Sequence, residues 1–356
     1  MTSRLNVFSC CCTLGLSLMQ GLPAQATTEE ELRELLASKA DTPDVPPTAA
    51  EIDAATFNGL ALPDGQSALT VKTQVLLDRA RVSPGIIDGY SGGMSTTAIM
   101  AFERMQGLPQ DGLLDNDVWE ALGGNLVGPI IATHVITQDE VASLSAGPLP
   151  SDYAELAQLD HIGYTTVPEL VAEAYHMDED FLRSLNPNAT WTVGESLTVV
   201  NPSVLSEEAA PGLSHIVVDK ATQRLTAYDA SGRVLGDYPV TVGSEGTPSP
   251  TGTHLVRAVA MEPTYTYDPS VNFQQGDNTE VLTLPPGPNG PVGSIWIDLD
   301  APTYGLHGTP NPDLLFTTES HGCVRMTNWD ATEMAKMVNA QFKVNADSKI
   351  DVVFQE

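Results

Sequence analysis

The chain has 356 residues, of which 46 are Asp or Glu and 16 are Lys or Arg, so its formal net charge at neutral pH is −30. This length allows two or three domains, each with its own core. The acidic balance excludes nucleic acid as a partner, because no basic stripe is available to neutralise phosphates. Acidity of this kind is most simply a source of solubility.

Residues 1–26 have the composition of a secretory signal peptide. Arg4 gives a positive start, residues 5–19 form an apolar run, and residues 24–26 read Ala-Gln-Ala, an A-x-A cleavage site. The run is short for a membrane span, and the part before Cys10 is too short for a lipoprotein signal. We therefore predict a mature chain without a transmembrane anchor, located in the periplasm or cell wall.

The distribution of the cysteines marks one position as a candidate for a reactive thiol. Three of the four, Cys10 to Cys12, lie in the predicted signal peptide, so the mature chain keeps only Cys323. Extracellular domains usually carry cysteines in pairs, and a lone thiol is otherwise a small buried hydrophobe. A zinc site needs three protein ligands at least, and the mature chain has no CxxC and no HxxxH. We expect no metal and no cofactor.

Two segments of different composition follow the predicted signal peptide. Residues 27–66 mix Glu, Pro, Ala and Thr with few large apolar residues, so we expect a flexible linker. Residues 67–124 show three stretches with helical spacing, separated by Asp-Gly turns. The apolar positions are Leu69, Val75 and Leu76, then Ala98, Ile99, Phe102 and Met105, then Val118, Trp119 and Leu122.

The order of these features resembles the peptidoglycan-binding type 1 domain. The features that carry the resemblance are Asp88-Gly89-Tyr90, Phe102, Gly107-Leu108-Pro109, Asp111-Gly112 and Trp119. The resemblance implies a small three-helix domain that binds the cell wall. Taken singly, each helix is equally well explained as plain core.

Residues 125–205 are expected to be a linker, with some strand at 130–136, followed by a small module at about 161–202. The module reads strand, helix, helix, strand: a Thr166-x-x-Glu169 capping box begins one helix, a second follows Asp178, and a strand covers 197–200.

Leu-Asn-Pro-Asn at 185–188 and Val-Gly-Glu-Ser-Leu at 193–197 resemble a LysM module. The resemblance implies a small α+β unit that binds N-acetylglucosamine-containing glycans. The usual Gly-Asp opening is missing at 165–168, so a purely structural LysM-like insert is the alternative.

Residues 212–356 have β character. Alternating apolar positions predict strands at 216–218, 225–227, 240–242, 255–259, 295–299 and 350–354. One helix is predicted from Ala331, Met334, Ala335 and Val338, with Asn328 or Asp330 as its cap.

The stretch LHGTPNPDLLFTTESHGCVRM at 306–326 gathers the candidate chemistry. Cys323 has two of the seven histidines nearby in sequence, His307 and His321. Sulfur attacks a carbonyl as thiolate, and an imidazole can take its proton, so Cys323 is a candidate nucleophile. Gly322, directly before it, lets the backbone approach a substrate and aim N–H groups at an oxyanion.

This stretch resembles the signature of the L,D-transpeptidase (YkuD-domain) family, in the branch with an HGT start and SHGC-apolar-Arg-Met. Arg325 departs from the version that has Asn after the apolar residue. Two rigid loops, TPSPTGT at 247–253 and LPPGP at 284–288, also resemble family segments. The resemblance thus covers about 140 residues, 212–356 at its widest, and implies a mainly β catalytic domain with a YkuD-like β-sandwich.

The resemblance implies residue roles. His307 would deprotonate Cys323, which attacks the third-residue carbonyl of a peptidoglycan tetrapeptide stem and releases D-alanine. Backbone N–H groups at Gly322 and Cys323 would hold the oxyanion. His321 and Ser320 would support the loop, and Gly308 would position His307 through its backbone.

Arg325 would bind a stem-peptide carboxylate or pair with an acidic residue. The acyl acceptor would be an amine of a second stem peptide, a D-amino acid or a wall-anchored lipoprotein.

Two alternatives stay open at this point. One is an L,D-carboxypeptidase or endopeptidase that uses water as the acceptor, and the sequence does not separate it from a transpeptidase. The other is a non-catalytic wall-binding protein, against which the His307 and Cys323 pair argues.

Overall fold

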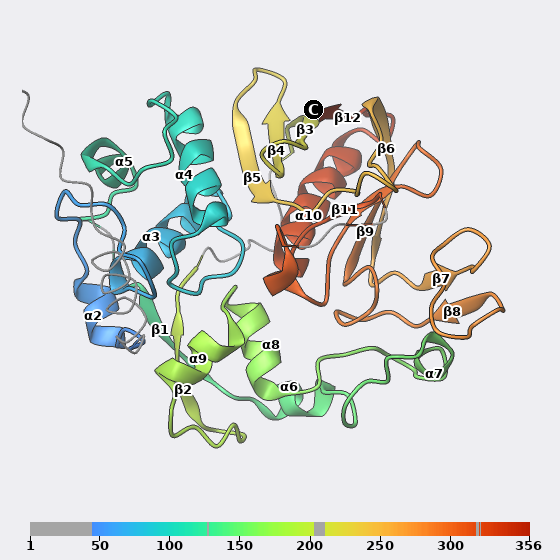
Figure 1. Cartoon of the computed structure of the whole chain (residues 1–356), viewed down its shortest axis with the longest axis horizontal. Coiled ribbons are helices and arrows are strands. Elements are labelled where there is room, and N and C mark those ends of the chain that lie inside the picture. The colour runs from blue at the N-terminus through green and yellow to red at the C-terminus, as the bar shows by residue number, and fades with distance from the viewer. Residues whose placement is uncertain (1–44, 127, 203–210, 318–319, 321) are drawn as a thin grey trace, which may run out of the picture. The chain divides into compact units, whose positions relative to one another are not determined.

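The computed structural model describes residues 45–126, 128–202, 211–317, 320 and 322–356 (Figure 1). The predicted signal peptide, the first part of the predicted linker at 27–66, and His321 lie outside the described residues. Everything described belongs to one compact unit, Val45–Glu356. The described residues include no helix that is both long enough and apolar enough to cross a membrane.

The helical region contains the three predicted helices and one more. Ser67 and Asp115 begin two of them, because their side chains accept hydrogen bonds from the N–H groups of Thr70 and Val118. The elements are α2 (Ala49–Ala54), α3 (Ala68–Arg79), α4 (Gly93–Gln106) and α5 (Asn116–Ala121).

Helix α2 corrects the prediction of a flexible linker for 27–66. Thr48 and Glu51 form a reciprocal capping box at its start, and Ile52 is fully buried. Lys72 Nζ donates to the Asp53 and Ala55 carbonyls at 3.3 and 2.8 Å. The part of this segment from residue 45 onward is therefore anchored by local capping and one buried side chain, a signal too short for composition to reveal.

The next module is a βααβ unit whose first strand lies earlier than predicted. Its elements are β1 (Ile131–Val135), α8 (Val167–Ala174), α9 (Glu179–Leu185) and β2 (Ser196–Val200), and β1 pairs antiparallel with β2. The expected strand near His161 is absent, since residues 161–164 form no strand. The chain between β1 and α8, residues 136–166, is called the insert below, and it contains α6 (Gln138–Ser143) and α7 (Tyr153–Leu156).

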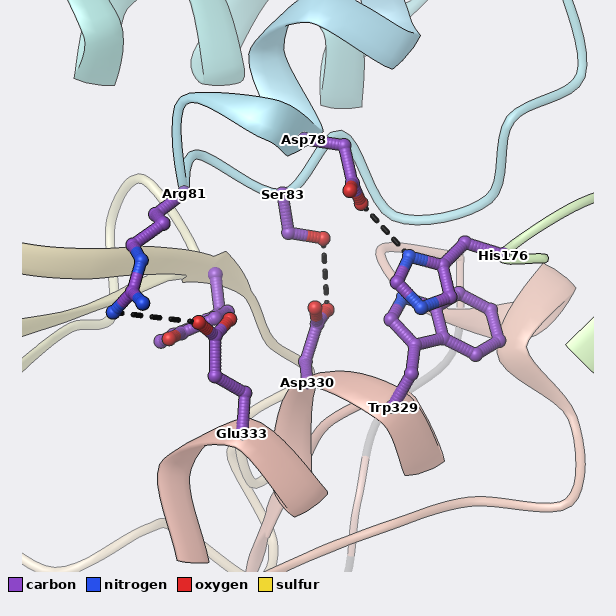
Figure 2. Close-up of a pocket in the computed structure, with 8 residues that line it drawn as sticks. Asp78, Arg81, Ser83, His176, Trp329, Asp330 and Glu333 are labelled. Carbon is purple, nitrogen blue, oxygen red and sulfur yellow. Dashed lines mark hydrogen bonds and ion pairs between the residues drawn. The ribbon is translucent and has the colours of Figure 1, made fainter. Parts of the chain in front are cut away.

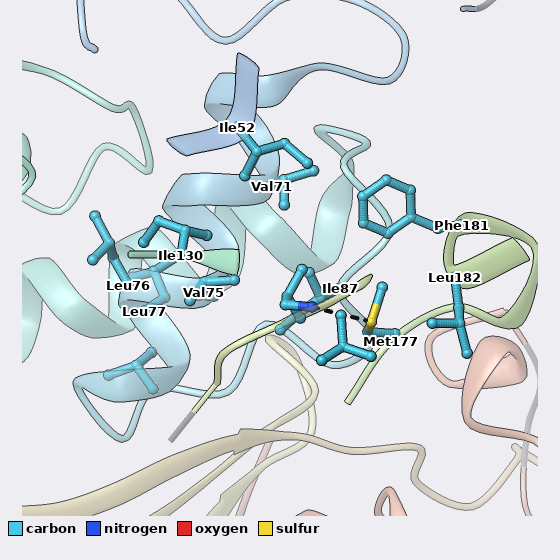
Figure 3. Packing of buried hydrophobic residues seen from close by; sticks show 14 of the residues in the cluster. Ile52, Val71, Val75, Leu76, Leu77, Ile87, Ile130, Met177, Phe181 and Leu182 are labelled. Atoms are coloured by element: carbon cyan, nitrogen blue, oxygen red, sulfur yellow. Dashed lines mark hydrogen bonds between the residues drawn. The ribbon is translucent and has the colours of Figure 1, made fainter. Parts of the chain in front are cut away.

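The helical region and the βααβ module share one hydrophobic core (Figure 3). Ile87, from the loop between α3 and α4, is fully buried together with Phe181 and Leu182 of α9. The Ile87 N–H donates to the His176 carbonyl at 2.7 Å. Two modules that the sequence predicted separately therefore pack as one body, because each alone would leave an apolar face exposed.

The last region is mainly β, as predicted, and is built on one eight-stranded sheet. The strand order is β11-β10-β9-β6-β12-β3-β4-β5. The strands are β3 (Leu213–Asp219), β4 (Arg224–Asp229), β5 (Val234–Pro239), β6 (Gly252–Met261), β9 (Ile295–Leu299), β10 (Gly305–His307), β11 (Val324–Arg325) and β12 (Asp351–Gln355). Helix α10 (Asn328–Val344) packs on this sheet and buries Ala331, Met334, Ala335 and Val338, the face that the sequence predicted.

The sheet curls so that its two ends approach each other. Just after β5, Thr241 and Arg325 exchange backbone hydrogen bonds of 3.0 and 2.9 Å, and Gly243 bridges to Ser320. The predicted strand at 240–242 is this bridging segment, whereas β5 itself ends at Pro239. These eight strands thus form one curled sheet, and not the two stacked sheets of the predicted β-sandwich.

Three further differences concern residues 211–356. A hairpin of β7 (Tyr265–Tyr267) and β8 (Leu282–Leu284) was not predicted, and a short 3-10 helix covers Pro312–Leu314. The cap of α10 is Thr327, whose side chain accepts from the Asp330 N–H at 3.0 Å, and not Asn328 or Asp330. Asn328 has another role, described next.

Candidate active site

His307 is the last residue of β10, and Cys323 directly precedes β11, the neighbouring strand of the curled sheet. Strands β10 and β11 are parallel, with His307 opposite Arg325 and Leu306 opposite Val324. Leu306 and Val324 point into the core, where they are 0% and 1% exposed. Because side chains alternate along a strand, His307, Arg325 and Cys323 emerge together on the other face.

The hydrogen bond of His307 fixes its tautomer. Its Nδ1 lies 2.7 Å from the Gly308 carbonyl oxygen, which can only accept, so Nδ1 carries the proton and Nε2 is the basic nitrogen. Burial lowers the pKa of His307 to about 4, against a smaller raising effect of the Gly308 hydrogen bond. The imidazole is therefore neutral at physiological pH and able to accept a proton.

Trp296 of β9 holds the His307 ring from one side. The two rings stack with centroids 5.7 Å apart and an interplanar angle of 20°. The indole also covers Gly305, where an added Cβ would lie 2.6 Å from the Trp296 ring. A glycine at 305 thus leaves room for the tryptophan that orients the histidine, and Trp296 is a site residue that the sequence motif did not identify.

The thiol of Cys323 is half-buried and faces a turn. Its Sγ lies 3.6 Å from the Thr303 carbonyl oxygen. Thr303 has φ +71°, a left-handed conformation that is costly for a β-branched residue and that turns its carbonyl toward the thiol. Burial raises the pKa of Cys323, while a Gly305 backbone hydrogen bond and the Arg325 charge oppose the rise. The resting sulfur is therefore a thiol.

Ser320 and Gly322 shape the loop before the cysteine. Ser320 Oγ donates to the Cys323 carbonyl at 2.5 Å and accepts from the Gly322 N–H at 3.0 Å. Gly322 has φ +113°, and an added Cβ would lie 2.6 Å from the Tyr304 ring. Ser249, from the TPSPTGT loop, donates to the Gly322 carbonyl at 2.8 Å. Glycine is therefore required at 322 by both conformation and space.

Arg325 is half-buried on the same face as the thiol. Burial lowers the pKa of its guanidinium, and the neighbouring Cys323 and Tyr153 oppose that shift. Of the residues predicted from the motif, the structure brings Cys323, His307, Gly308, Ser320, Gly322 and Arg325 into one region.

Asn328 packs against Gly308, the residue whose carbonyl orients His307. Its Oδ1 accepts from the Ser294 N–H at 3.0 Å, and its Nδ2 donates to Glu173 Oε1 at 2.8 Å. An added Cβ at Gly308 would lie 2.1 Å from Asn328 Oδ1. Burial raises the pKa of Glu173 to about 7, and this carboxyl also lines a cavity of about 580 Å³. No sequence spacing connects α8 to this position, so the contact is visible only in the fold.

A second group of buried titratable side chains lies at the start of α10 (Figure 2). Asp78 Oδ2 is 2.9 Å from His176 Nδ1, and the His176 ring stacks on Trp329 with centroids 5.0 Å apart. Ser83 Oγ donates to Asp330 at 2.9 Å. The space between them, about 10 Å³, is the size of one water. This cluster joins the helical region to the catalytic sheet and is too small for a substrate.

No three His, Cys, Asp or Glu side chains are grouped so as to hold a metal ion in the parts of the chain that the structure describes. Cys323 is a free thiol.

Comparison with known proteins identifies two domains. Residues 214–345 match the model of the YkuD family, the L,D-transpeptidase catalytic domain, and residues 67–122 match a family described as "Putative peptidoglycan binding domain". Both assignments agree with the resemblances drawn from the sequence.

Several curated proteins are similar to about half of this chain. "Putative L,D-transpeptidase YkuD" of Bacillus subtilis is 29% identical over 170 residues, 47% of this chain and 85% of the relative. The Bacillus licheniformis protein of the same name is 28% identical over 171 residues, 48% of this chain and 87% of the relative. "Probable L,D-transpeptidase YbiS" of Escherichia coli is 27% identical over 199 residues, 53% of this chain and 64% of the relative.

Similar solved structures are distant. An L,D-transpeptidase from Mycobacterium smegmatis has a TM-score of 0.30 at 18% identity, covering 46% of this chain and 65% of that one. An L,D-transpeptidase from Stackebrandtia nassauensis has a TM-score of 0.30 at 14% identity, covering 85% and 95%. The family models and the curated proteins thus show similarity to an L,D-transpeptidase catalytic domain at residues 214–345 and to a putative peptidoglycan-binding domain at residues 67–122.

Proposed function

We propose that the protein is a peptidoglycan L,D-transpeptidase in which Cys323 is the nucleophile and His307 the general base. The observation that supports the proposal is the pairing of β10 with β11, in which His307 lies opposite Arg325 and Cys323 directly precedes β11, with the Nδ1 proton of His307 held by Gly308. The basic Nε2 is then left for the thiol.

The reaction would start from a neutral pair. His307 Nε2 takes the thiol proton as sulfur attacks the third-residue carbonyl of a tetrapeptide stem. Collapse of the tetrahedral adduct breaks the peptide bond, the imidazolium protonates the leaving amine of D-alanine, and a thioester remains on Cys323. An acceptor amine then attacks the thioester, His307 removes its proton, and the thiol is regenerated.

The loop residues would stabilise the oxyanion, fix the conformation of the loop and bind a carboxylate of the substrate. Gly322 already donates its N–H to Ser320, so its contribution is chiefly to the loop conformation, and the Cys323 N–H is our candidate oxyanion donor. Ser320 fixes the Cys323 carbonyl. Arg325 supplies a positive charge for a stem-peptide carboxylate. His321 is proposed to support this loop, on the motif alone.

The other modules would bring the catalytic domain to its substrate. A peptidoglycan-binding domain covers 67–122, and binding to an insoluble polymer raises the local concentration of its stem peptides. We propose that the βααβ module contacts glycan and that the protein acts outside the cytoplasm. The acceptor would be a second stem peptide, a D-amino acid or a wall-anchored lipoprotein.

The test is mass spectrometry of the protein incubated with disaccharide tetrapeptide and increasing amounts of a D-amino acid. We expect a transient tripeptide adduct on Cys323 and a rising share of exchanged tetrapeptide, with neither product in Cys323→Ala. Free tripeptide as the single product at every acceptor concentration would assign the protein as an L,D-carboxypeptidase. Turnover by Cys323→Ala would exclude the thiol mechanism.

A further inference from the structure

The insert of the βααβ module reaches the catalytic domain and packs on the β7–β8 hairpin (Figure 1). Leu156 and Ile162 of the insert form a separate small core with Tyr267 and Leu284 of the hairpin, and all four are at most 6% exposed. The insert lies outside the part of the chain that matches the catalytic family. Its contact with the hairpin is therefore a feature of this chain and not of the matched domain.

Backbone hydrogen bonds fix this contact. The Ile162 N–H donates to the Pro286 carbonyl at 2.8 Å, and the Asn289 N–H donates to the Ile162 carbonyl at 3.1 Å. Gln275, in the loop between β7 and β8, both accepts a hydrogen bond from the insert and donates one to it. Its Oε1 accepts from the Tyr153 N–H at 3.1 Å, and its Nε2 donates to the Ser151 carbonyl at 2.8 Å. These hydrogen bonds fix the position of the insert on the hairpin, including the backbone of Tyr153.

The side chain of Tyr153 packs against aromatic side chains of the hairpin and of the loop that joins its two strands. Its ring meets those of Tyr265, Tyr267 and Phe273 at 6.2, 5.3 and 6.1 Å, each close to perpendicular. These edge-to-face contacts fix the ring. The Asp152 side chain caps α7 by accepting from the Ala154 N–H, which fixes the backbone that carries it.

The hairpin rises from the same end of the sheet as the catalytic residues. Ala260 of β6, Trp296, His307 and Arg325 are successive register partners across four strands. The chain leaves β6 at Met261 and enters β7 at Tyr265. The phenols of Tyr153 and Tyr265 are accordingly within electrostatic reach of Arg325 and Cys323, respectively.

We propose that Tyr153 is a specificity-determining residue of the proposed transpeptidase site, where its phenol and the guanidinium of Arg325 together bind the terminal carboxylate of the stem peptide. The proposal rests on the proposed function. Burial raises the pKa of Tyr153, against a smaller lowering effect of Arg325, so the phenol keeps its proton and can donate. One planar cation and one hydroxyl donor satisfy the two oxygens of a carboxylate, and neither suits a C-terminal amide as well.

The test compares a tetrapeptide that ends in a free carboxylate with its C-terminal amide. We expect Tyr153→Phe, which keeps the ring contacts, to raise KM for the acid about tenfold, the loss expected for one hydrogen bond to a charged group. Its kcat for the acid and its kinetics on the amide should stay close to those of the unaltered protein. Tyr228→Phe, in β4, where the ring stacks on His215, is the matched control and should change the kinetics on neither substrate.

The outcomes separate the two proposals. If the unaltered protein turns over neither peptide, the proposed function fails. If it turns over the acid and Tyr153→Phe shows the same preference for acid over amide, the proposed function stands and the role of Tyr153 is overturned. An equal loss on both peptides assigns Tyr153 to the support of the hairpin and also overturns carboxylate recognition.

Discussion

At the scale of single residues, the pKa shifts of the proposed catalytic pair fit general base catalysis and not a preformed ion pair. The pKa of His307 is lowered to about 4 and that of Cys323 is raised, so the neutral forms of both groups are favoured across the physiological range. Many reactive cysteines are activated by the opposite arrangement, a lowered thiol pKa beside a cation. Here the proton has to move during attack on the substrate.

This arrangement predicts the pH dependence of thiol alkylation. Iodoacetamide reacts with the thiolate, so its second-order rate with Cys323 should stay low near neutral pH and rise only above the ordinary thiol pKa of about 8.5. The rate is measured by intact-protein mass between about pH 5 and about pH 10. A plateau already reached near pH 6 would show a thiolate–imidazolium pair and contradict the neutral resting state.

Asn328 provides a second prediction at this scale. Asn328→Ala removes the acceptor of the Ser294 N–H and leaves space beside Gly308, so the carbonyl that orients His307 loses its support. We expect kcat to fall about tenfold, because misplaced catalytic groups cost rate steeply, with a stability loss of about 1–3 kcal/mol. Asn345→Ala, just after the end of the same helix, is the control. Unchanged kcat in Asn328→Ala would limit its role to packing.

At the scale of elements, the insert explains a glycine of the LPPGP loop. Gly287 has φ +146°, and an added Cβ would lie 2.2 Å from the Ile162 carbonyl oxygen. The loop therefore approaches the insert backbone as closely as only glycine allows. The loop and the insert recognise each other through main-chain groups that no side-chain pattern encodes.

Gly287→Ala should therefore loosen the insert from the hairpin. We expect the melting temperature to fall by several degrees, corresponding to about 1–3 kcal/mol, and amide exchange to increase in residues 151–163. Gly246→Ala, where an added Cβ meets a single atom at 3.9 Å, is the matched control. If exchange in the insert is unaffected by Gly287→Ala, the close contact does not hold the insert in place.

At the scale of the whole molecule, polar groups join the helical region to the catalytic sheet. Asp237 of β5 accepts from Arg224 at 2.7 Å and from Arg104 of α4, and Arg224 Nη1 donates to the Ser83 carbonyl at 3.0 Å. Asp237 and Arg224 are at most 2% exposed. Removing either partner would leave a buried charge without compensation, so the two regions are expected to unfold together.

The buried cluster of Figure 2 makes stability depend on pH. Burial raises the pKa of Asp330 to about 7, so between about pH 4 and about pH 7 the folded chain binds a proton that the unfolded chain does not, and stability falls as pH rises. Burial lowers the pKa of His176, but Asp78 outweighs this and the net change is a rise. The stability from His176 is likewise present at low pH and lost as pH rises.

The melting temperature should accordingly be higher at about pH 5.5 than at about pH 8. Asp330→Asn removes one titrating group while keeping a polar partner for Ser83, so the difference between the two pH values should shrink. Asp347→Asn, on an exposed turn, is the control and should keep the full difference. An equal pH dependence in Asp330→Asn and the unaltered protein would show that the cluster does not titrate on unfolding.

Much of the chain could be predicted from local pattern. Periodicity identified α3, α4, α8 and the face of α10, because a helix that packs on a core repeats its apolar residues at a fixed spacing. The motif at 306–326 identified the catalytic domain, since the chemistry of a thiol and an imidazole restricts which residues can stand together. The predicted capping box marked the start of α8, where Thr166 Oγ1 accepts from the Glu169 N–H, but the Glu169 carboxylate accepts from Thr165 and not from the Thr166 N–H.

What the tertiary structure decided lies where distant segments meet. The βααβ module takes its first strand from 131–135, across an insert that local pattern cannot bridge. Trp296, Asn328, Glu173 and Tyr153 reach the region of His307 and Cys323 from different elements. Pairing of strands and packing of loops bring these residues together through contacts far apart in sequence, and such contacts leave no periodic signal in the chain. The sequence therefore determined which residues are the candidates for the chemistry, and the fold determined which residues surround them.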